Sequence, residues 1–362
     1  MLTEATQWLE RIQALPLTSP LRIMNVCGGH ERSLTQAGLR SLLPEQVVLI
    51  PGPGCPVCIC PEEDLYAAIQ LALHEPVTLM AYGDMLRVPV NVPKGGVNSL
   101  QVARTAGANI QPIASPQEML AFARNNPNRQ VCFFMAGFET TTAPLAAMLL
   151  EGVPDNLSIL LSARLTWPAV ARLLESEKPS FDGLIAPGHV AAIMGAEQWR
   201  FVVQQSATPC AVAGFSAESL LAAIYSTLRQ VLEGKPMLDN CYQEVVRDEG
   251  NLAAQRIIEQ VLTVADANWR GIGVIPDSGY QLRADYAAYD ARQRFAIVVD
   301  AQRKRAGEMP PGCDCAQVLL GRIYPNQCAL YGRGCSPSQP VGPCMVSDEG
   351  ACHIWWRGGV RA

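Results

Sequence analysis

The sequence predicts an α/β protein with two parallel sheets whose strand ends face one cleft, followed by a smaller cysteine-rich region. Three observations support this fold class. Short apolar runs alternate with helical patterns along most of the chain. Clusters of Gly, Cys and His follow many of these apolar runs. Six cysteines then lie within the last fifty of the 362 residues.

The expected elements follow in a regular order. An amphipathic helix capped by Thr3 is expected over residues 3–15, because apolar residues recur there at helical spacing. Helical patterns also lie near 33–43 and 61–73, the second with acidic residues at its positive end. Strands are expected at 21–26, 47–50, 77–82, 131–136, 157–161, 183–186 and 211–213.

Strand-then-helix alternation is typical of parallel sheets covered by helices. We therefore expect two Rossmann-like domains, at residues 18–115 and 116–235. Ligands bind beyond the carboxyl ends of the strands in such sheets, where the Gly, Cys and His clusters fall. Gly, Pro and Cys become frequent after residue 236 and strands become hard to recognise. Residues 236–362 are therefore expected to form a third, smaller region that is stabilised by a bound metal.

Composition excludes several classes of function. The net charge is −5, and no Lys/Arg run forms the basic patch that nucleic-acid binding needs. The N-terminus is unlike a signal peptide, and no apolar stretch reaches the roughly 18 residues of a membrane span. A cytoplasmic protein is expected, in which 13 cysteines indicate metal or redox chemistry. Cys132 and Cys210, inside apolar strands, are expected to be buried hydrophobes.

The first cluster is Cys-Gly-Gly-His at residues 27–30, where a strand should lead into a helix. The two glycines let the backbone approach a ligand closely. A cysteine beside a helix N-terminus should have a lowered pKa, so Cys27 is expected to be available as a thiolate. His30 would supply a second ligand or a proton. The alternative is a tight turn with a buried cysteine.

The second cluster is a Cys-x-x-Cys pair, Cys55 and Cys58, after a rigid Gly-Pro-Gly turn. Such a pair closes a disulfide or holds a metal, and its thiols are typically acidified. No second pair stands at zinc-ribbon spacing, which favours a redox dithiol over structural zinc. Cys60 adds a third sulfur nearby.

The third candidate is a series of four cysteines separated by twelve, six and sixteen residues. Four thiolates from separate loops can hold either zinc or a [4Fe–4S] cluster, and spacing does not decide between them. Cys313 could replace the first member of the series, and Cys344 is also in range. The four members are Cys315, Cys328, Cys335 and Cys352.

Glu139 lies in a Gly-Phe-Glu-Thr-Thr run at the end of a predicted strand. Its carboxylate, the hydroxyls and the helix N-terminal amides could bind an anion or polarise a ligand. The alternative is helix capping by Thr140 or Thr141. His189, after a Pro-Gly pair, has the same two interpretations.

Taken together, these motifs resemble the hydrogenase maturation factor HypD family. The resemblance runs nearly end to end and in the same order. Stretches such as 250–252, 269–271 and 347–352 add to it. The motifs that carry it are residues 27–30, 52–58, 137–141 and 186–190 and the four-cysteine series.

The resemblance implies a scaffold for the Fe(CN)2CO group of [NiFe]-hydrogenases, rather than a stand-alone turnover enzyme. A HypC-type small chaperone and a HypE-type cyanide donor would be its partners. Cys27 would hold the iron, and Cys55 and Cys58 would be a redox pair. His30 and Glu139 would line the cleft. Cys315, Cys328, Cys335 and Cys352 would hold a [4Fe–4S] cluster. This cluster, similar to that of ferredoxin:thioredoxin reductase, would pass electrons to the redox pair.

The chain departs from the family pattern at one place. The family commonly continues Cys-Gly-Gly-His with Thr-His, whereas this chain has Glu31 and Arg32. A second cleft histidine is therefore missing. Cys60 is an additional thiol that could compete in the disulfide chemistry.

Two other functions are compatible with the same residues. One is a self-contained iron–sulfur thiol–disulfide oxidoreductase, based on Cys55, Cys58 and the C-terminal series. The other is a structural zinc protein that binds partners. Cys27 distinguishes the scaffold from the oxidoreductase, because a simple reductase needs no third thiol on another strand end.

Overall fold

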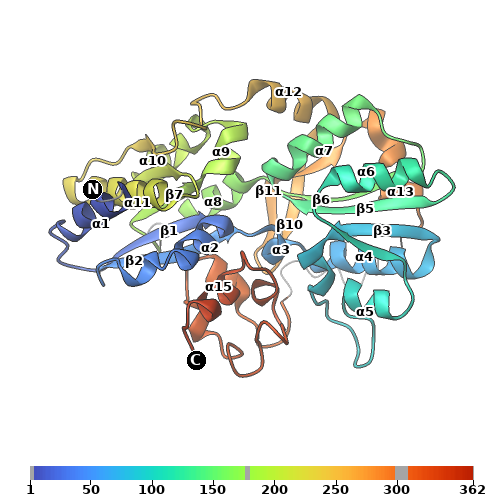
Figure 1. Ribbon diagram of the computed structural model, residues 1–362, viewed down its shortest axis with the longest axis horizontal. Coiled ribbons are helices and arrows are strands. Elements are labelled where there is room, and N and C mark those ends of the chain that lie inside the picture. Colours follow the sequence, from blue (N-terminus) through green and yellow to red (C-terminus); the bar gives the residue numbers. More distant parts are fainter. Residues whose placement is uncertain (1–3, 176–179, 298–308, 362) are drawn as a thin grey trace.

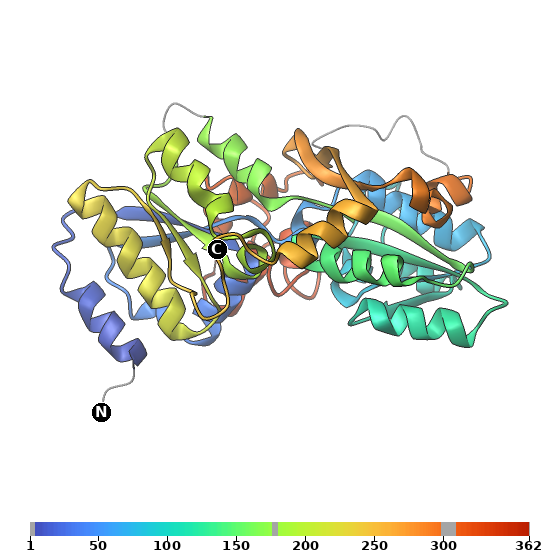
Figure 2. The ribbon, with the colours of Figure 1, turned by 90° about the horizontal axis from the view of Figure 1, so that it is seen from above.

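The structure is a computed structural model that describes residues 4–175, 180–297 and 309–361. Two parallel β-sheets lie beside each other along the long axis, and the cysteine-rich C-terminal region lies below them in Figure 1. Seen from above in Figure 2, helices flank each sheet. The predicted α/β class with parallel sheets is confirmed.

The first sheet, sheet A, brings together strands that are far apart in the sequence. Its central pairing sets Ile23 opposite Leu49 on one side and Gly183 on the other, all in parallel. These strands are mostly apolar because helices cover the sheet. Their spatial order is β2 (Val47–Gly54), β1 (Leu21–Cys27), β7 (Gly183–Pro187), β8 (Cys210–Ala213) and β9 (Leu238–Asn240).

The second sheet, sheet B, is built from the middle of the chain and is also parallel. Its longest strand carries a continuous buried run from Val131 to Gly137. The spatial order of its strands is β4 (Ile110–Ile113), β3 (Val77–Tyr82), β5 (Gln130–Gly137) and β6 (Leu157–Ala163).

The sheets do not follow the predicted segments 18–115 and 116–235, because each segment contributes strands to both sheets. The chain leaves sheet A after β2, forms all of sheet B, and returns to sheet A at β7. Sheet A also takes β9 from the predicted third region. The one-sheet-per-segment division is therefore corrected. The alternation of strands and helices indicates that the strands pair in parallel, but it does not indicate which strands pair with one another.

The helices fall largely where apolar periodicity places them. The N-terminal helix begins at Glu4, and its expected cap, Thr3, lies outside the described residues. The second helix begins directly after Cys27 rather than near residue 33 as predicted. The first helices are α1 (Glu4–Gln13), α2 (Gly28–Gln36), α3 (Pro56–Ile59), α4 (Glu62–His74), α5 (Leu100–Thr105), α6 (Pro116–Asn125) and α7 (Glu139–Glu151). The remaining helices are α8 (Thr166–Leu174), α9 (Gly188–Met194), α10 (Arg200–Ser206), α11 (Ala217–Glu233), α12 (Leu252–Val261), α13 (Ala291–Arg294), α14 (Cys315–Leu319) and α15 (Ala351–Arg357).

Two elements after residue 250 connect the two halves of the molecule. Helix α12 packs against both α7 and α9, at the top of Figure 1. The antiparallel hairpin of β10 (Leu262–Trp269) and β11 (Gly273–Leu282) packs on β6 and α8. Sequence patterns did not reveal this hairpin, because its exposed positions interrupt the apolar alternation.

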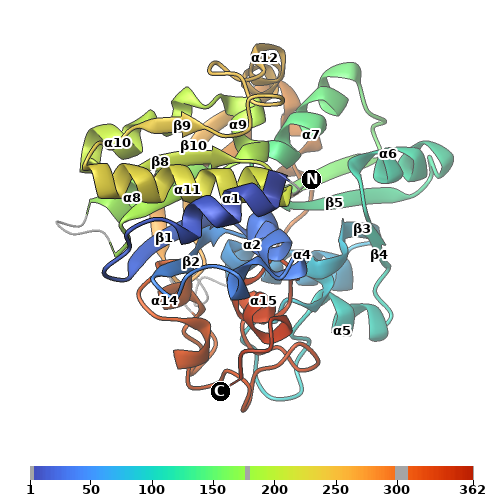
Figure 3. The same ribbon diagram turned by 60° about the vertical axis from the view of Figure 1, so that its left-hand side comes forward.

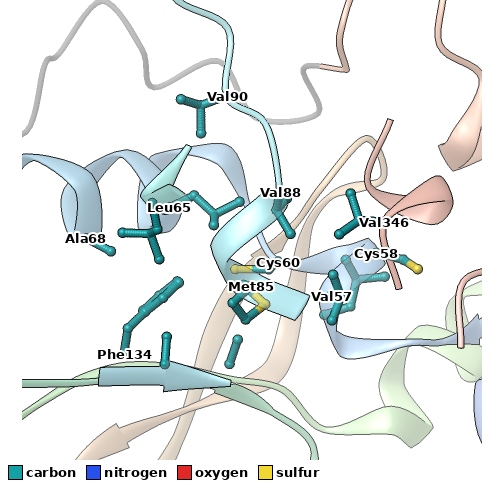
Figure 4. Close-up of a cluster of buried hydrophobic side chains, with 14 of the residues drawn as sticks. Val57, Cys58, Cys60, Leu65, Ala68, Met85, Val88, Val90, Phe134 and Val346 are labelled. Atoms are coloured by element: carbon teal, nitrogen blue, oxygen red, sulfur yellow. The ribbon is translucent and has the colours of Figure 1, made fainter. Parts of the chain in front are cut away.

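A buried core joins the C-terminal region to the rest of the molecule. Figure 4 shows Val346 beside Val57 and Cys58, with Met85 of the segment after β3 close by. Helices α14 and α15 lie against the side of the molecule formed by β2 and α2 (Figure 3). The C-terminal region is therefore packed into the fold rather than tethered to it.

Two further findings bear on the predicted class. Cys132 and Cys210 are buried inside strands, as predicted for small hydrophobes. No helix in the described part of the chain combines the length and apolar character that crossing a membrane would require.

The end of sheet A depends on a close backbone approach at Gly54, the residue before Cys55. A β-carbon on Gly54 would lie 1.4 Å from the Val26 carbonyl oxygen. Gly54→Ala must therefore push β1 and β2 apart, and we expect a loss of stability of about 1–3 kcal/mol or more. Urea denaturation followed by circular dichroism measures it.

The matched control for this change is Gly83→Ala. A β-carbon there meets no heavy atom of the described residues within 4 Å, and no positive φ is involved. Equal denaturation midpoints for the two variants would contradict the steric argument.

Candidate functional site

The carboxyl ends of strands from both sheets line one cavity of about 530 Å³. Sheet A contributes the ends of β1, β2, β7 and β8, and sheet B contributes the ends of β5 and β6. The predicted cleft at the strand ends is therefore present. Its chemically distinctive lining residues are Cys27, Arg32, Thr140, Thr141, Thr166, His189, Phe215, Tyr242 and Glu349.

Cys27 ends β1, caps α2 and lines the cavity. Burial raises the pKa of the Cys27 thiol to about 12, although backbone N–H groups of His30 and Gly29 oppose the shift. The predicted lowering of this pKa is therefore wrong for the protein without bound metal. Desolvation outweighs the helix N-terminus here, because protein atoms surround the partly exposed Cys27.

His30 lies behind the cavity rather than in its wall. Its Nδ1 is 3.1 Å from the Oδ1 of Asn25, whose Nδ2 donates to Glu31 at 2.9 Å. The His30 ring also packs on Phe215, with ring centroids 4.7 Å apart. Burial lowers the pKa of His30 to about 3, so the ring is neutral. The expectation that His30 lines the cleft is corrected: it supports Phe215, which does.

The two residues that depart from the family pattern have separate positions. Glu31 is on the buried face of α2 and pairs with Arg40. Arg32 lines the cavity and pairs with Asp348 at 3.0 Å. A histidine is still present in the cavity wall, because His189 stacks on Phe215 with a centroid distance of 3.8 Å. Sequence reasoning noted His189 but could not choose between its two interpretations.

Glu139 is also buried behind the wall. Its carboxylate accepts hydrogen bonds from the Thr166 backbone N–H at 2.7 Å and from the Thr166 hydroxyl at 2.8 Å. Burial raises the pKa of Glu139 to about 7. Glu139 therefore ties the loop after β5 to the start of α8, while its neighbours Phe138 and Thr140 face the cavity.

Cys55 and Cys58 are joined by a disulfide, with their Cα atoms 5.3 Å apart. Cys55 caps helix α3, and the next residue, Pro56, lines the cavity. Both sulfurs lie in the buried core that the C-terminal region shares. The disulfide therefore adjoins the cavity on one side and the C-terminal region on the other.

Cys60 is directed away from the disulfide. Its sulfur lies 3.5 Å from the hydroxyl of Ser162 on β6, and that hydroxyl donates to Asp64 at 2.6 Å. Burial raises the pKa of Cys60 to about 12. The structure thus gives no support to the expectation that Cys60 competes in the disulfide chemistry.

The six cysteines of the C-terminal region are all buried and form what we call the C-terminal cysteine group. The sulfurs of Cys313 and Cys315 are 3.3 Å apart. Hydrogen bonds from Cys315 and Cys344 lower the pKa of Cys352 to about 6. Cys313 and Cys315 are the two candidates for the first cluster ligand, and both belong to the group. Its members are Cys313, Cys315, Cys328, Cys335, Cys344 and Cys352.

The C-terminal cysteine group lies next to the disulfide helix. The 3₁₀ turn η7 (Pro343–Met345), which contains Cys344, packs directly against α3. Within the described residues, no set of three or more Cys, His, Asp or Glu side chains is arranged to hold a metal ion. The thiols are thus gathered in space, but they do not form a ready-made single-ion site.

The fold and site define a thiol-rich α/β protein with one cysteine in a cavity between two parallel sheets, a disulfide beside it and six further thiols behind it. The HypD family, described as "Hydrogenase formation hypA family", matches residues 3–359. The chain belongs to this family.

Named relatives agree with the family match. The hydrogenase maturation factor HypD of Rhodobacter capsulatus is 37% identical over 100% of this chain and 96% of its own length. The HypD of Escherichia coli strain K12 is 38% identical over 96% of this chain and 92% of its own. A putative hydrogenase expression/formation protein of Methanocaldococcus jannaschii is 35% identical over 93% and 92%.

The raised pKa of Glu139 predicts a pH-dependent stability. The folded protein holds the Glu139 proton up to about pH 7, whereas an unfolded chain releases it near pH 4.5. Stability from this group is therefore fully present below pH 4.5 and is lost as pH rises through about 7. Glu139→Gln cannot ionise and can keep both Thr166 contacts. We expect it to gain stability over wild type with rising pH, by roughly 3 kcal/mol at pH 8.

Urea denaturation at a series of pH values measures this difference. Glu151→Gln, at the exposed end of the same helix, is the control and should follow the wild type. A stability difference between Glu139→Gln and wild type that does not change with pH would refute the assignment.

Proposed function

We propose that this chain is a maturation scaffold on which the Fe(CN)2CO group of [NiFe]-hydrogenases is assembled. A HypC-type small chaperone and a HypE-type cyanide donor would be its partners, in the cytoplasm. The observation that carries the proposal is the position of Cys27, which opens into a cavity lined by the strand ends of both sheets. The hydrogenase maturation named in its relatives supports the same function.

Iron with its cyanide and CO ligands is the cargo of such a scaffold. A cysteine thiolate is a soft ligand and suits an iron that carries these ligands. Because burial holds the pKa of Cys27 near 12, iron must displace the thiol proton as it binds. The cavity of about 530 Å³ leaves room for a second ligand from the chaperone.

We further propose that Cys55 and Cys58 cycle between disulfide and dithiol during assembly. Reduction of the disulfide consumes two electrons and two protons, and the electrons must come from a donor outside the chain. The packing of η7 against α3 supports a route through the C-terminal cysteine group, since it brings Cys344 up to the disulfide helix. A bound [4Fe–4S] cluster would supply one-electron transfer along this route.

The donor set of the C-terminal cysteine group fits such a cluster. A [4Fe–4S] cluster needs four thiolates, and six buried thiols are present. Four thiolates could also hold zinc, and metal analysis distinguishes the two. We propose as ligands the four members predicted from the sequence, Cys315, Cys328, Cys335 and Cys352.

A self-contained thiol–disulfide oxidoreductase is the second candidate function. The disulfide between Cys55 and Cys58 favours it, because a reductase needs only this pair and an electron source. The position of Cys27 favours the scaffold, because a third thiol in the cavity has no role in a simple reductase.

Replacing Cys27 separates these two functions. We expect Cys27→Ala to fold and keep its C-terminal metal centre, because Cys27 lies outside that group. It should lose both the infrared bands of bound cyanide and CO in the complex with the chaperone and hydrogenase maturation. Infrared spectroscopy of the co-purified complex and a hydrogenase assay measure this.

The matched control is Cys241→Ala, a half-buried cysteine that does not line this cavity. It should keep the bands. Retention of the bands by Cys27→Ala would remove the central residue from the proposal.

The cluster assignment has its own test. We expect strictly anaerobic protein to contain about four iron and four sulfide per chain, as a [4Fe–4S] centre requires. Cys328→Ala or Cys335→Ala should lose them and destabilise the C-terminal region, because metal binding and folding are coupled there. Cys210→Ala, inside β8, should retain both. Stoichiometric zinc in place of iron would overturn the assignment.

A further inference from the structure

Arg270, the residue after β10, has a completely buried guanidinium group. Its Nη2 donates to the Pro89 carbonyl at 2.7 Å and lies 3.5 Å from Glu62. Its Nε and Nη1 have no hydrogen-bond partner in the described part of the chain. A guanidinium is always charged and carries five N–H donors, so three of them are left unused in the interior.

Buried donors without partners are rare in folded proteins, because each one loses its hydrogen bonds to water. Elsewhere in the described residues, Arg22 and Arg40 each have one buried nitrogen without a partner, whereas Arg270 has two and Arg164 has none. All three nitrogens of Arg164 donate, to the carbonyls of Asn268 and Ala163 and to Asp64. The two unpartnered nitrogens of Arg270 therefore point to an acceptor outside the described residues.

The neighbourhood of Arg270 indicates what that acceptor is. The Arg270 backbone N–H donates to Ile59 at 3.0 Å, between Cys58 and Cys60. On the other side, a β-carbon on Gly271 would lie 2.6 Å from the side chain of Ala316, the residue after Cys315. Arg270 thus lies between the disulfide helix and the C-terminal cysteine group.

The two carboxylates near Arg270 have other partners. Both oxygens of Glu62 already accept hydrogen bonds from Asn91, at 2.9 and 2.8 Å. Asp64 is paired with Arg164 and Arg292.

We propose that Arg270 is a positioning residue for the C-terminal metal centre, whose free Nε and Nη1 donors compensate the negative charge that the cysteine sulfurs acquire on binding metal. This inference rests on the proposed [4Fe–4S] cluster. Four thiolates around such a cluster carry a net negative charge, and reduction adds one more. Hydrogen bonds and positive charge at the sulfurs raise the reduction potential of such a centre.

The test is a potentiometric titration of the anaerobic full-length protein, followed by visible absorption and electron paramagnetic resonance. At a fixed potential we expect Arg270→Met to lower the reduced-to-oxidised ratio of the cluster at least tenfold, which equals about 59 mV for a one-electron couple. Arg270→Lys, which keeps the charge but loses the fork of donors, should shift less. Arg164→Met is the matched control for loss of a buried arginine, and it should match the wild type.

The outcomes distinguish the two proposals. A wild-type protein that takes up neither iron nor sulfide would refute the cluster and with it this inference. A loaded Arg270→Met protein with wild-type potential would refute the inference alone. A folded Arg270→Met protein that cannot hold the cluster, while Arg270→Lys can, would support charge compensation.

A second measurement needs no variant and covers the case in which Arg270→Met does not fold. Wild-type protein grown with arginine labelled with 15N in the guanidinium is reduced, and pulsed electron paramagnetic resonance detects labelled nitrogen near the cluster. We expect a 15N coupling that is absent from unlabelled protein. Its absence from the labelled protein would overturn the assignment of Arg270.

Discussion

The site depends on one topological constraint: the chain crosses twice between two parallel sheets, so that the strand ends of both sheets open into the same cavity. Parallel strands in one sheet all end on the same edge, which is where such proteins bind ligands. The pairing of β1 with β7 completes sheet A from segments that lie on either side of sheet B in the sequence. This arrangement brings Cys27, Thr140 and His189, from distant parts of the sequence, to one place.

Burial then sets the charge state of the site. Desolvation raises the pKa values of Cys27 and Glu139 and lowers that of His30, in each case favouring the neutral form. The pair of Arg32 and Asp348, both half exposed, carries charge at the rim. Binding of iron to Cys27 would therefore add charge to the site, and Arg270 would balance a similar change at the C-terminal cysteine group.

The departure from the family pattern shows how a buried charge is accommodated. Glu31 is on the buried face of α2, where a lone carboxylate would be costly. Arg40 pairs with it, and Asn25 donates to it while also contacting His30. Glu31 therefore contacts the support of the cavity wall through Asn25, although Glu31 itself does not line the cavity.

Sequence alone determined the parallel α/β class, most strand positions, the cysteine motifs and the location of the cavity at strand ends. These features follow from local periodicity and from chemistry carried by short motifs. It could not determine that the strands of sheet B lie in sequence between two adjoining parts of sheet A, because strand order is decided by pairing between distant segments. Nor could it determine that burial raises the pKa of Cys27, that Glu139 lies behind the wall, or that two nitrogens of Arg270 have no partner in the described residues. Those properties depend on how much water and which partners reach each group, and only tertiary packing decides both.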